Sequence, residues 1–143
     1  MIIVGRPADA TKVINKFIEN KPIKNRIKII KWIEDSELKI ILSNAKIFIF
    51  PSIYEGFGIP IIEAMACGVP VLTTRYSCLP EIGGDAADYV DPLNSINLAV
   101  SIRKLLVDDN KIDDLIEKGF QNIKRFRWHE SAKIIQQTIT QNK

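Results

Sequence analysis

The sequence predicts a protein of the α/β class, in which helices cover both faces of a parallel sheet. Short apolar runs, such as residues 1–4 and 47–50, alternate with longer segments whose apolar residues recur at helical spacing. This alternation is typical of strand–helix–strand units, which build parallel sheets. The chain has 143 residues, of which 46% are hydrophobic, enough for one compact core. We therefore predict a single domain over residues 1–143.

The first part of the chain predicts a strand, a helix and a second strand. Residues 1–4 are apolar and stop at Gly5, as a short buried strand does. A helix is expected from about Asp9 to a position before Pro22, and residues 26–30 form the next predicted strand. The helix places one apolar face on the residues Val13, Ile14, Phe17 and Ile18.

The next segments predict a helix, a central strand and a loop at the end of that strand. Asp35 or Ser36 is the expected N-cap of a helix whose apolar face is Leu38, Ile41, Leu42 and Ala45. Residues 47–50 form a predicted strand, and residues 51–59 contain one proline and two glycines. Because ligands of open α/β sheets bind at the carboxyl ends of the strands, we expect this loop to border a ligand site.

Further helices and strands follow the loop. Pro60 suits a first helical turn, and Gly68 suits the residue after a helix end. Residues 69–73 then form a predicted strand, and residues 79–84 a turn-rich loop. The remaining predictions are a short edge strand at 88–90 and helices at 94–107, 111–126 and 129–140.

Composition excludes several classes of protein. Charged residues make up 26% of the chain and the formal net charge is +3, with no long run of one sign, so we expect no nucleic-acid partner. Cys67, Cys78 and His129 lack the spacing of metal ligands, which predicts a reduced, metal-free, cytoplasmic protein. No apolar run approaches the ~20 residues of a membrane span, so any membrane contact is expected to be peripheral.

Two carboxylates flank the glycine-containing loop. Glu55 lies in the loop, and Glu63 follows it by eight positions in the predicted helix. The amides at a helix N-terminus, together with the helix dipole, bind phosphate readily, and Gly56 and Gly58 let the backbone approach a ligand closely. Glu63 can then accept hydrogen bonds from vicinal hydroxyls, while Glu55 accepts from sugar hydroxyls or stabilises positive charge on a sugar ring. The pattern predicts a sugar-diphosphate site.

The same segment resembles a known family, the retaining glycosyltransferases of the GT-B fold often called family 4, which carry a Glu-x7-Glu motif. Here the motif is Glu55-Gly-Phe-Gly-Ile-Pro-Ile-Ile-Glu63, within a longer matching phrase from Pro51 to Val71. Similar phrases cover nearly the whole chain: Ile2-Ile3-Val4-Gly5, residues 29–33, residues 35–45, Leu79 to Ala86, Asp91-Pro92 and Phe126-Arg127-Trp128.

The resemblance implies a Rossmann-like three-layer fold, the C-terminal half of a GT-B enzyme, and a donor site. Glu55, as the catalytic residue, would contact the donor hexose together with the backbone of Gly56, Phe57, Gly58 and Ile59. Glu63 would hold the ribose hydroxyls, and Lys31, Trp32 and Ile33 would border the base. The implied reaction is hexose transfer from a nucleoside-diphosphate sugar, with retention and without a cofactor or obligatory metal. Phe57 itself is either a core side chain or a sugar platform.

Members of the family are two-domain enzymes of more than twice this length. The resemblance therefore implies that an N-terminal acceptor domain is absent here, and that the donor domain lacks its first strand and helix together with a basic pair for the pyrophosphate. Mannose or glucose from GDP or UDP is the expected donor, and a glycan or lipid-linked molecule the expected acceptor. The alternative function is a non-catalytic binding or assembly module with the same fold.

Overall fold

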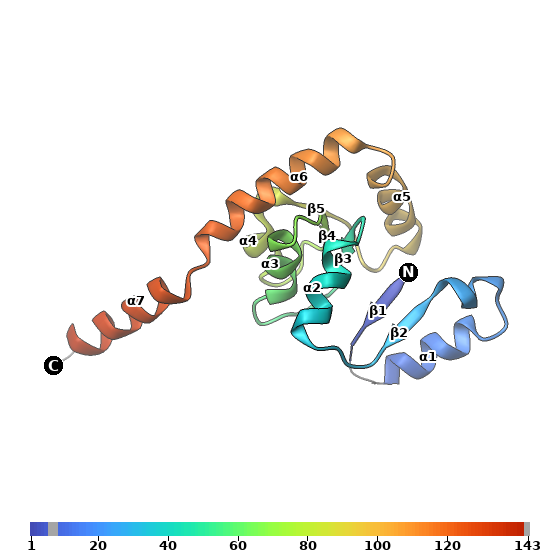
Figure 1. The fold of residues 1–143 in the computed structure, drawn as a ribbon, viewed down its shortest axis with the longest axis horizontal. Helices are drawn as coiled ribbons and strands as arrows, with labels where there is room; N and C mark the ends of the chain where they lie inside the picture. The colour runs from blue at the N-terminus through green and yellow to red at the C-terminus, as the bar shows by residue number, and fades with distance from the viewer. Residues whose placement is uncertain (6–8, 142–143) are drawn as a thin grey trace. The chain divides into compact units, whose positions relative to one another are not determined.

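A computed structural model describes residues 1–5 and 9–141 of the chain, which divide into two compact units, Met1–Ile40 and Ile41–Lys143. Both units contain parallel strands with flanking helices, as Figure 1 shows. The predicted α/β class is confirmed, with the strands paired in two sheets, one in each unit. No helix in the described part of the chain is long and apolar enough to cross a membrane.

The first unit is built from two strands and the helices that connect them. Strands β1 (Ile2–Val4) and β2 (Lys28–Ile30) pair in parallel, with Ile3 opposite Ile29. Helix α1 (Asp9–Ile18) and a short 3-10 helix (Pro22–Arg26) connect them. The predicted strand at 26–30 therefore begins two residues late, because Pro22 starts a tight helical turn that ends at Arg26.

Helix α2 (Asp35–Ser43) begins in the first unit and ends in the second. Our N-cap prediction of Asp35 or Ser36 is wrong, since the helix already includes both residues. Glu34 directly precedes the helix, and its amide donates to the carboxylate of Glu37 at 3.4 Å. Glu37 is the third residue of the helix, the position whose side chain accepts this bond in a capping box. The apolar face was predicted correctly in that Leu42 is buried.

The second unit has three parallel strands in the order β3 (Phe48–Ile49), β4 (Val71–Thr73) and β5 (Ala87–Tyr89). Leu72 lies opposite both Ile49 and Asp88. The central strand β4 is buried along its whole length, as expected for a strand with neighbours on both sides and helices on its faces. The predicted edge strand is present, one residue earlier than expected.

Helix α3 (Ile59–Ala66) connects β3 and β4, and both of its ends are set by glycines. Gly58, before the helix, has φ 97°, and Gly68, after it, has φ 69°. At the C-terminal end, the amide of Val69 donates to Ala64 O and that of Gly68 to Met65 O, both at 3.0 Å. These two bonds form a Schellman motif, which confirms Gly68 as the residue that ends the helix.

The segment after β4 corrects one prediction. Residues 79–84 are not a turn-rich loop: Leu79–Gly83 form helix α4, and Gly84–Ala86 continue as a 3-10 helix. Pro80 stands in the first turn, where its missing amide is tolerated, and Leu79 and Ile82 are buried. Pro80 therefore marks the start of a short helix, and Gly83 and Gly84 mark its end.

Three further helices complete the second unit: α5 (Ser95–Leu105), α6 (Asp109–Asn122) and α7 (Trp128–Gln141), with a 3-10 turn at Ile123–Arg125. All three were predicted, with ends shifted by up to four residues. Side chains of β4, α5 and α6 form the core with the residue after β5; its buried members are Leu72, Val90, Leu105 and Leu115. Along α7 the apolar side chains Ile134, Ile135 and Ile139 are exposed.

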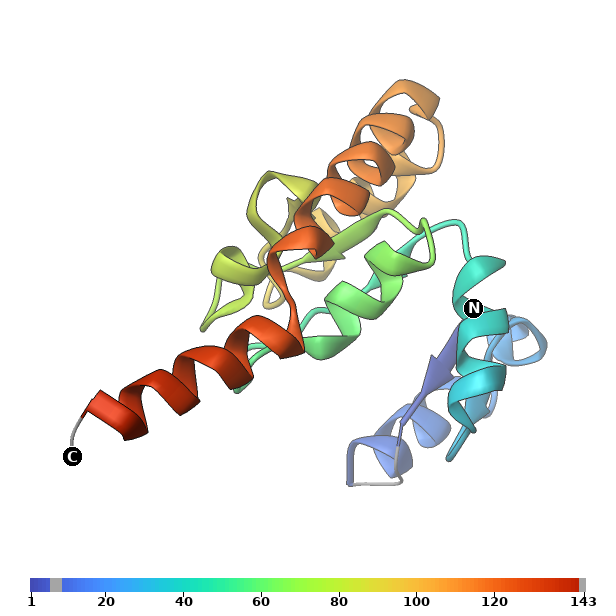
Figure 2. The same ribbon diagram turned by 60° about the vertical axis from the view of Figure 1, so that its left-hand side comes forward.

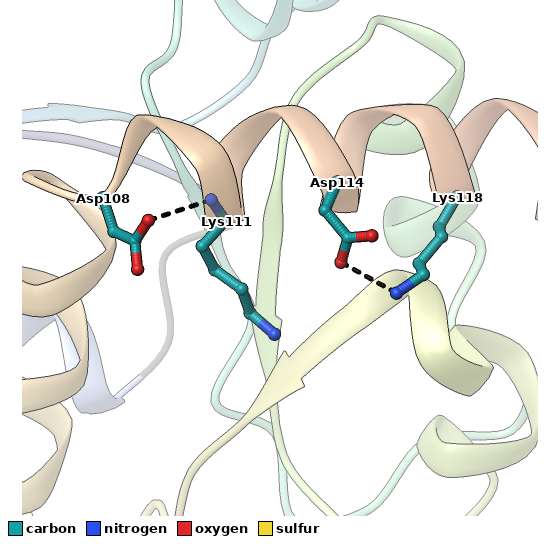
Figure 3. A network of polar contacts seen from close by, with 4 residues as sticks. All are labelled: Asp108, Lys111, Asp114 and Lys118. Carbon is teal, nitrogen blue, oxygen red and sulfur yellow. Dashed lines mark hydrogen bonds and ion pairs between the residues drawn. The ribbon is translucent and has the colours of Figure 1, made fainter.

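Helix α6 begins with a side-chain cap and carries an ion pair on its surface (Figure 3). The carboxylate of Asp108 accepts a hydrogen bond of 3.0 Å from the amide of Lys111, as an N-cap residue does. One turn further on, Lys118 Nζ lies 2.8 Å from Asp114 Oδ2. Hydrogen bonding to Asp114, the larger cause, and nearby carboxylates raise the pKa of Lys118. Helices α3 and α6 lie side by side in both views (Figures 1 and 2). The side chain of Met65 on α3 lies so close to Gly119 on α6 that a β-carbon there would be 3.3 Å from Met65 Cγ.

Candidate functional site

The candidate site is the loop between β3 and α3, at the carboxyl end of the sheet in the second unit. The loop after β4 lies beside it, because β3 and β4 are parallel neighbours whose chains leave the sheet at the same edge. Two buried threonines at the end of β4 hold the start of the first loop. Thr73 Oγ1 donates to Phe50 O at 2.9 Å, and Thr74 Oγ1 donates to Ser52 O at 2.6 Å.

The side chain of Glu55 is fixed within this loop. Its Oε1 accepts a hydrogen bond of 2.8 Å from Ser52 Oγ, and the residue is half-buried. The second carboxylate oxygen has no protein partner among the described residues. Glu55 is therefore held in one orientation while it retains an oxygen that can accept from a bound molecule.

The backbone of the loop is fixed by two side chains from the segment after β4. Ser77 Oγ donates to Glu55 O at 2.8 Å, and it accepts from the amide of Glu55 at 3.4 Å. Cys78 Sγ lies 3.3 Å from both Glu55 O and Phe57 O. The carbonyls of Glu55 and Phe57 therefore point toward residues 77 and 78.

This orientation determines where the neighbouring amides point. A trans peptide directs its N–H opposite to its C=O, and the described residues contain no cis peptide bond. The amides of Gly56 and Gly58 are consequently turned away from residues 77 and 78. In the described part of the chain, nothing accepts a hydrogen bond from the amides of residues 56–59. Since Gly58 is buried, its unpaired amide is unusual in a folded protein.

Helix α3 follows these amides directly. Gly58 is its N-cap, and only glycine fits there without strain: the backbone has φ 97°, and a β-carbon would lie 3.0 Å from Leu79 Cδ2. The unpaired amides therefore extend into the N-terminus of a helix, whose dipole favours an anion. Glu63 is the fifth residue of α3 and is exposed. A carboxylate thus lies on each side of the row of free donors.

Phe57 has features of both of its predicted roles. Its ring meets the ring of Phe126 edge to face, with 5.8 Å between centroids, yet 43% of the residue is exposed. Phe126 in turn lies beneath the guanidinium of Arg125, at 5.1 Å. Phe57 therefore packs against another aromatic ring, while part of the residue stays open to solvent.

The structure brings some of the predicted site residues together within one segment. Glu55, the residues 56–59 and Glu63 lie on the loop and helix between β3 and β4. Lys31, Trp32 and Ile33 follow β2 and belong to the first unit; Lys31 and Trp32 are exposed, and Ile33 is half-buried. No cluster of three or more metal-ligating side chains occurs among the residues that the structure describes.

Sequence reasoning missed the contribution of Thr74, Ser77 and Cys78. The cysteine was treated only as a residue without metal-ligand spacing, and the two hydroxyl residues lie 22 positions from their partners. A usable signal was nevertheless present. The ends of neighbouring parallel strands meet at one edge, so the residues after β4 were candidates for contact with the loop after β3.

Comparisons with known proteins identify the family of this chain. Residues 1–122 match the family model described as "Glycosyl transferases group 1". The O-antigen chain mannosyltransferase B of Escherichia coli is 33% identical over 128 residues, which are 90% of this chain and 34% of that protein. The MMP alpha-(1->4)-mannosyltransferase of Mycolicibacterium hassiacum is 31% identical over 121 residues, which are 82% of this chain and 29% of that protein. The chain thus spans about a third of the length of these relatives.

Solved structures show the same fold. The sucrose-phosphate synthase of Thermosynechococcus elongatus superimposes with a TM-score of 0.86 at 26% identity, over 98% of this chain and 37% of that one. HepE of Anabaena, solved with UDP and glucose, gives a TM-score of 0.86 at 24% identity, over 98% of this chain and 40% of that one. Both the family model and the relatives match the segment that holds Glu55, the free amides and Glu63, and the chain belongs to the group 1 family of glycosyl transferases.

Proposed function

We propose that this chain supplies the donor site of a retaining glycosyltransferase, which transfers a hexose from a nucleoside-diphosphate sugar to a glycan or lipid-linked acceptor. The observation that carries the proposal is the row of unpaired amides at residues 56–59, which runs from Glu55 into the N-terminus of α3. Four successive backbone donors beside a helix N-terminus suit an oxygen-rich anion. Family membership makes a sugar diphosphate the natural choice.

In this proposal the two carboxylates divide the donor between them. Glu63 accepts hydrogen bonds from the ribose hydroxyls, since it lies one turn into the helix whose N-terminus receives the diphosphate. Glu55 accepts from hydroxyls of the hexose through its free oxygen, while Ser52 holds the other oxygen at 2.8 Å. Neutralising charge on the sugar ring as the leaving group departs is the catalytic role that we assign to Glu55.

The remaining site residues complete the donor site. Gly56, Phe57, Gly58 and Ile59 bind the hexose and phosphates through their amides in this proposal. The family resemblance alone assigns the base to Lys31, Trp32 and Ile33. The helix dipole and these amides stabilise the diphosphate, so the proposal includes no metal ion or other cofactor. The free thiols of Cys67 and Cys78 agree with a reducing, cytoplasmic location. The acceptor is bound by a part of the enzyme outside this segment, as in a two-domain glycosyltransferase.

We favour mannose as the transferred hexose. The relatives at 33% and 31% identity are both named mannosyltransferases. Glucose is the second candidate, because a sucrose synthase of Melioribacter roseus is 30% identical over 121 residues. The base can be guanine or uracil, and one titration series covers both sugars and both bases.

Calorimetric titration of the chain with GDP, GDP-mannose, UDP and UDP-glucose tests the proposal. We expect saturable binding of one diphosphate and tighter binding of its sugar conjugate. Glu63→Ala should weaken both ligands, because both contain the ribose. Glu55→Ala should weaken only the sugar conjugate, because only that ligand contains the hexose.

Glu117→Ala is the matched control, since Glu117 is an exposed helical glutamate on α6. Its affinities should equal those of the wild-type chain. The proposal is wrong if the wild-type chain binds none of the four ligands, or if neither Glu55→Ala nor Glu63→Ala changes an affinity. An assembly module that binds no nucleotide sugar would give the first of these results.

A further inference from the structure

Ser77 has an unusual backbone conformation. It is the only non-glycine residue with positive φ in the described part of the chain, at 54°. The β-carbon of an L-residue is crowded there, so serine adopts this conformation only when its surroundings hold it. Ser77 is exposed, which means that burial of its side chain does not supply the reason.

The hydrogen bonds of the Ser77 hydroxyl explain this conformation. Ser77 Oγ contacts both main-chain groups of Glu55: it donates to the carbonyl at 2.8 Å and accepts from the amide at 3.4 Å. Among the residues that the structure describes, its only other polar neighbour is the adjacent Cys78 Sγ, at 4.0 Å. The left-handed conformation therefore directs this hydroxyl at the backbone of one residue, 22 positions earlier.

We infer that Ser77 is a positioning residue for the donor sugar: its hydroxyl sets the peptide planes on both sides of Glu55, and so aims the carboxylate and the amide of Gly56. The inference rests on the proposed donor site. Ser77 does not touch the hexose in this scheme; it acts through Glu55. Cys78 supports the next part of the loop, where its thiol meets Glu55 O and Phe57 O at 3.3 Å.

Three substitutions of Ser77 separate positioning from folding stability. Ser77→Ala removes the hydroxyl and keeps the β-carbon, whereas Ser77→Gly removes both and relieves the backbone. Ser77→Thr keeps a hydroxyl but adds a β-branch, which is least favourable in the left-handed region. Stability should therefore rank glycine above alanine, while the hydroxyl is present only in wild type and threonine. Ser131→Ala, at an exposed serine of α7, is the control.

The readout is the affinity ratio of sugar conjugate to free diphosphate, measured by calorimetry, with the midpoint of thermal unfolding recorded for each variant. We expect the ratio to fall roughly three- to tenfold, the effect of one net hydrogen bond, in both Ser77→Ala and Ser77→Gly. Ser77→Thr should retain most of the ratio although it unfolds at a lower temperature. Affinity for the free diphosphate should fall less than affinity for the sugar conjugate, because only one of the four amides that meet it, that of Gly56, depends on Ser77.

Two results would overturn the inference while the donor site stands. In the first, Glu55→Ala lowers the ratio but Ser77→Ala and Ser77→Gly leave it unchanged. In the second, the ratio follows the unfolding midpoint, so that glycine retains it and threonine loses it. Failure of the proposed function is a different result: the wild-type chain binds no sugar conjugate, or neither Glu55→Ala nor Glu63→Ala changes an affinity.

Discussion

The side-chain amide of Asn122 donates a hydrogen bond of 2.8 Å to the carbonyl oxygen of Ile82 and thereby joins the end of α6 to α4. Asn122 is buried, and its Oδ1 accepts from Arg125 Nη1 at 2.8 Å. The same guanidinium reaches Glu81 O through Nη2 at 3.3 Å. Residues near the end of α6 therefore satisfy carbonyls of the short helix that directly follows Ser77 and Cys78.

Replacing Asn122 should destabilise the second unit. Asn122→Ala leaves the Ile82 carbonyl without its buried donor, and we expect the free energy of unfolding to fall by about 1–3 kcal/mol. Guanidinium denaturation measures this change. Gln121→Ala, at the exposed neighbouring position, should change it by less than about 0.5 kcal/mol. Equal effects of the two substitutions would contradict the assigned role of Asn122.

The two glycines of the candidate site should respond differently to alanine. Gly58→Ala forces a β-carbon into a left-handed conformation and to 3.0 Å from Leu79 Cδ2, so we expect a loss of at least about 1–2 kcal/mol. Gly56→Ala meets no atom within 4 Å and has no positive φ. Its unfolding free energy should stay within about 1 kcal/mol of wild type. Thermal and denaturant unfolding of Gly58→Ala and Gly56→Ala measure these free energies. A strongly destabilised Gly56→Ala would contradict the open space around this residue.

Tyr89 should make stability depend on alkaline pH. Burial raises the pKa of its phenol above the ordinary value of 10.0; Arg75 opposes that shift, and Asp85 adds to it. Between the unfolded and folded pKa values the unfolded chain has released a proton that the folded chain retains, so stability falls as pH rises above about 10. The contribution is fully present below that pH.

Denaturation of wild type and Tyr89→Phe between neutral pH and pH about 11 measures this dependence. The phenylalanine variant loses the hydrogen bond from the hydroxyl to Gly84 O (2.6 Å), so it should be less stable at neutral pH and lose less stability in alkali. Tyr54→Phe, at a residue that is 84% exposed, is the matched control. Parallel pH curves for wild type and Tyr89→Phe would rule out this phenol as the source.

Asp108 should contribute more to the stability of α6 than other surface residues of the helix do. Its carboxylate caps the helix through the amide of Lys111, and loss of such a cap costs about 0.5–2 kcal/mol. Asp108→Ala should therefore lower the free energy of unfolding by that amount, as measured in denaturant. Asp113→Ala, in the exposed middle of the helix, should have little effect. A larger loss in Asp113→Ala would place the support of α6 elsewhere.

The sequence predicts the fold best where periodicity extends over many residues. Helices at residues 94–107, 111–126 and 129–140 were found because each repeats its apolar positions over several turns. It fails at Leu79–Gly83, where a helix of five residues is too short to show a period and Pro80 suggests a turn. The segment from Pro22 to Arg26 is similar, since a 3-10 turn has no apolar face of its own.

The candidate site could likewise be predicted from the sequence only in part. Glu55, the glycines and Glu63 are close in sequence, so their motif is visible in the chain itself. Ser77 is not, because its contact depends on the parallel pairing of β3 with β4 and on a left-handed φ that no local pattern of a serine predicts. Contacts across a parallel sheet require the topology before they can be inferred.

The glycines at both ends of α3 restrict how this segment can change in evolution. Gly58 and Gly68 fix where the helix begins and ends, so a one-residue insertion or deletion between them cannot be absorbed at either boundary. If it precedes Glu63, it would instead rotate this residue by about 100° relative to the loop that carries Glu55. We therefore expect homologous chains to vary in residue type along α3 while they keep its length, and to accept insertions at exposed turns such as the one between α5 and α6.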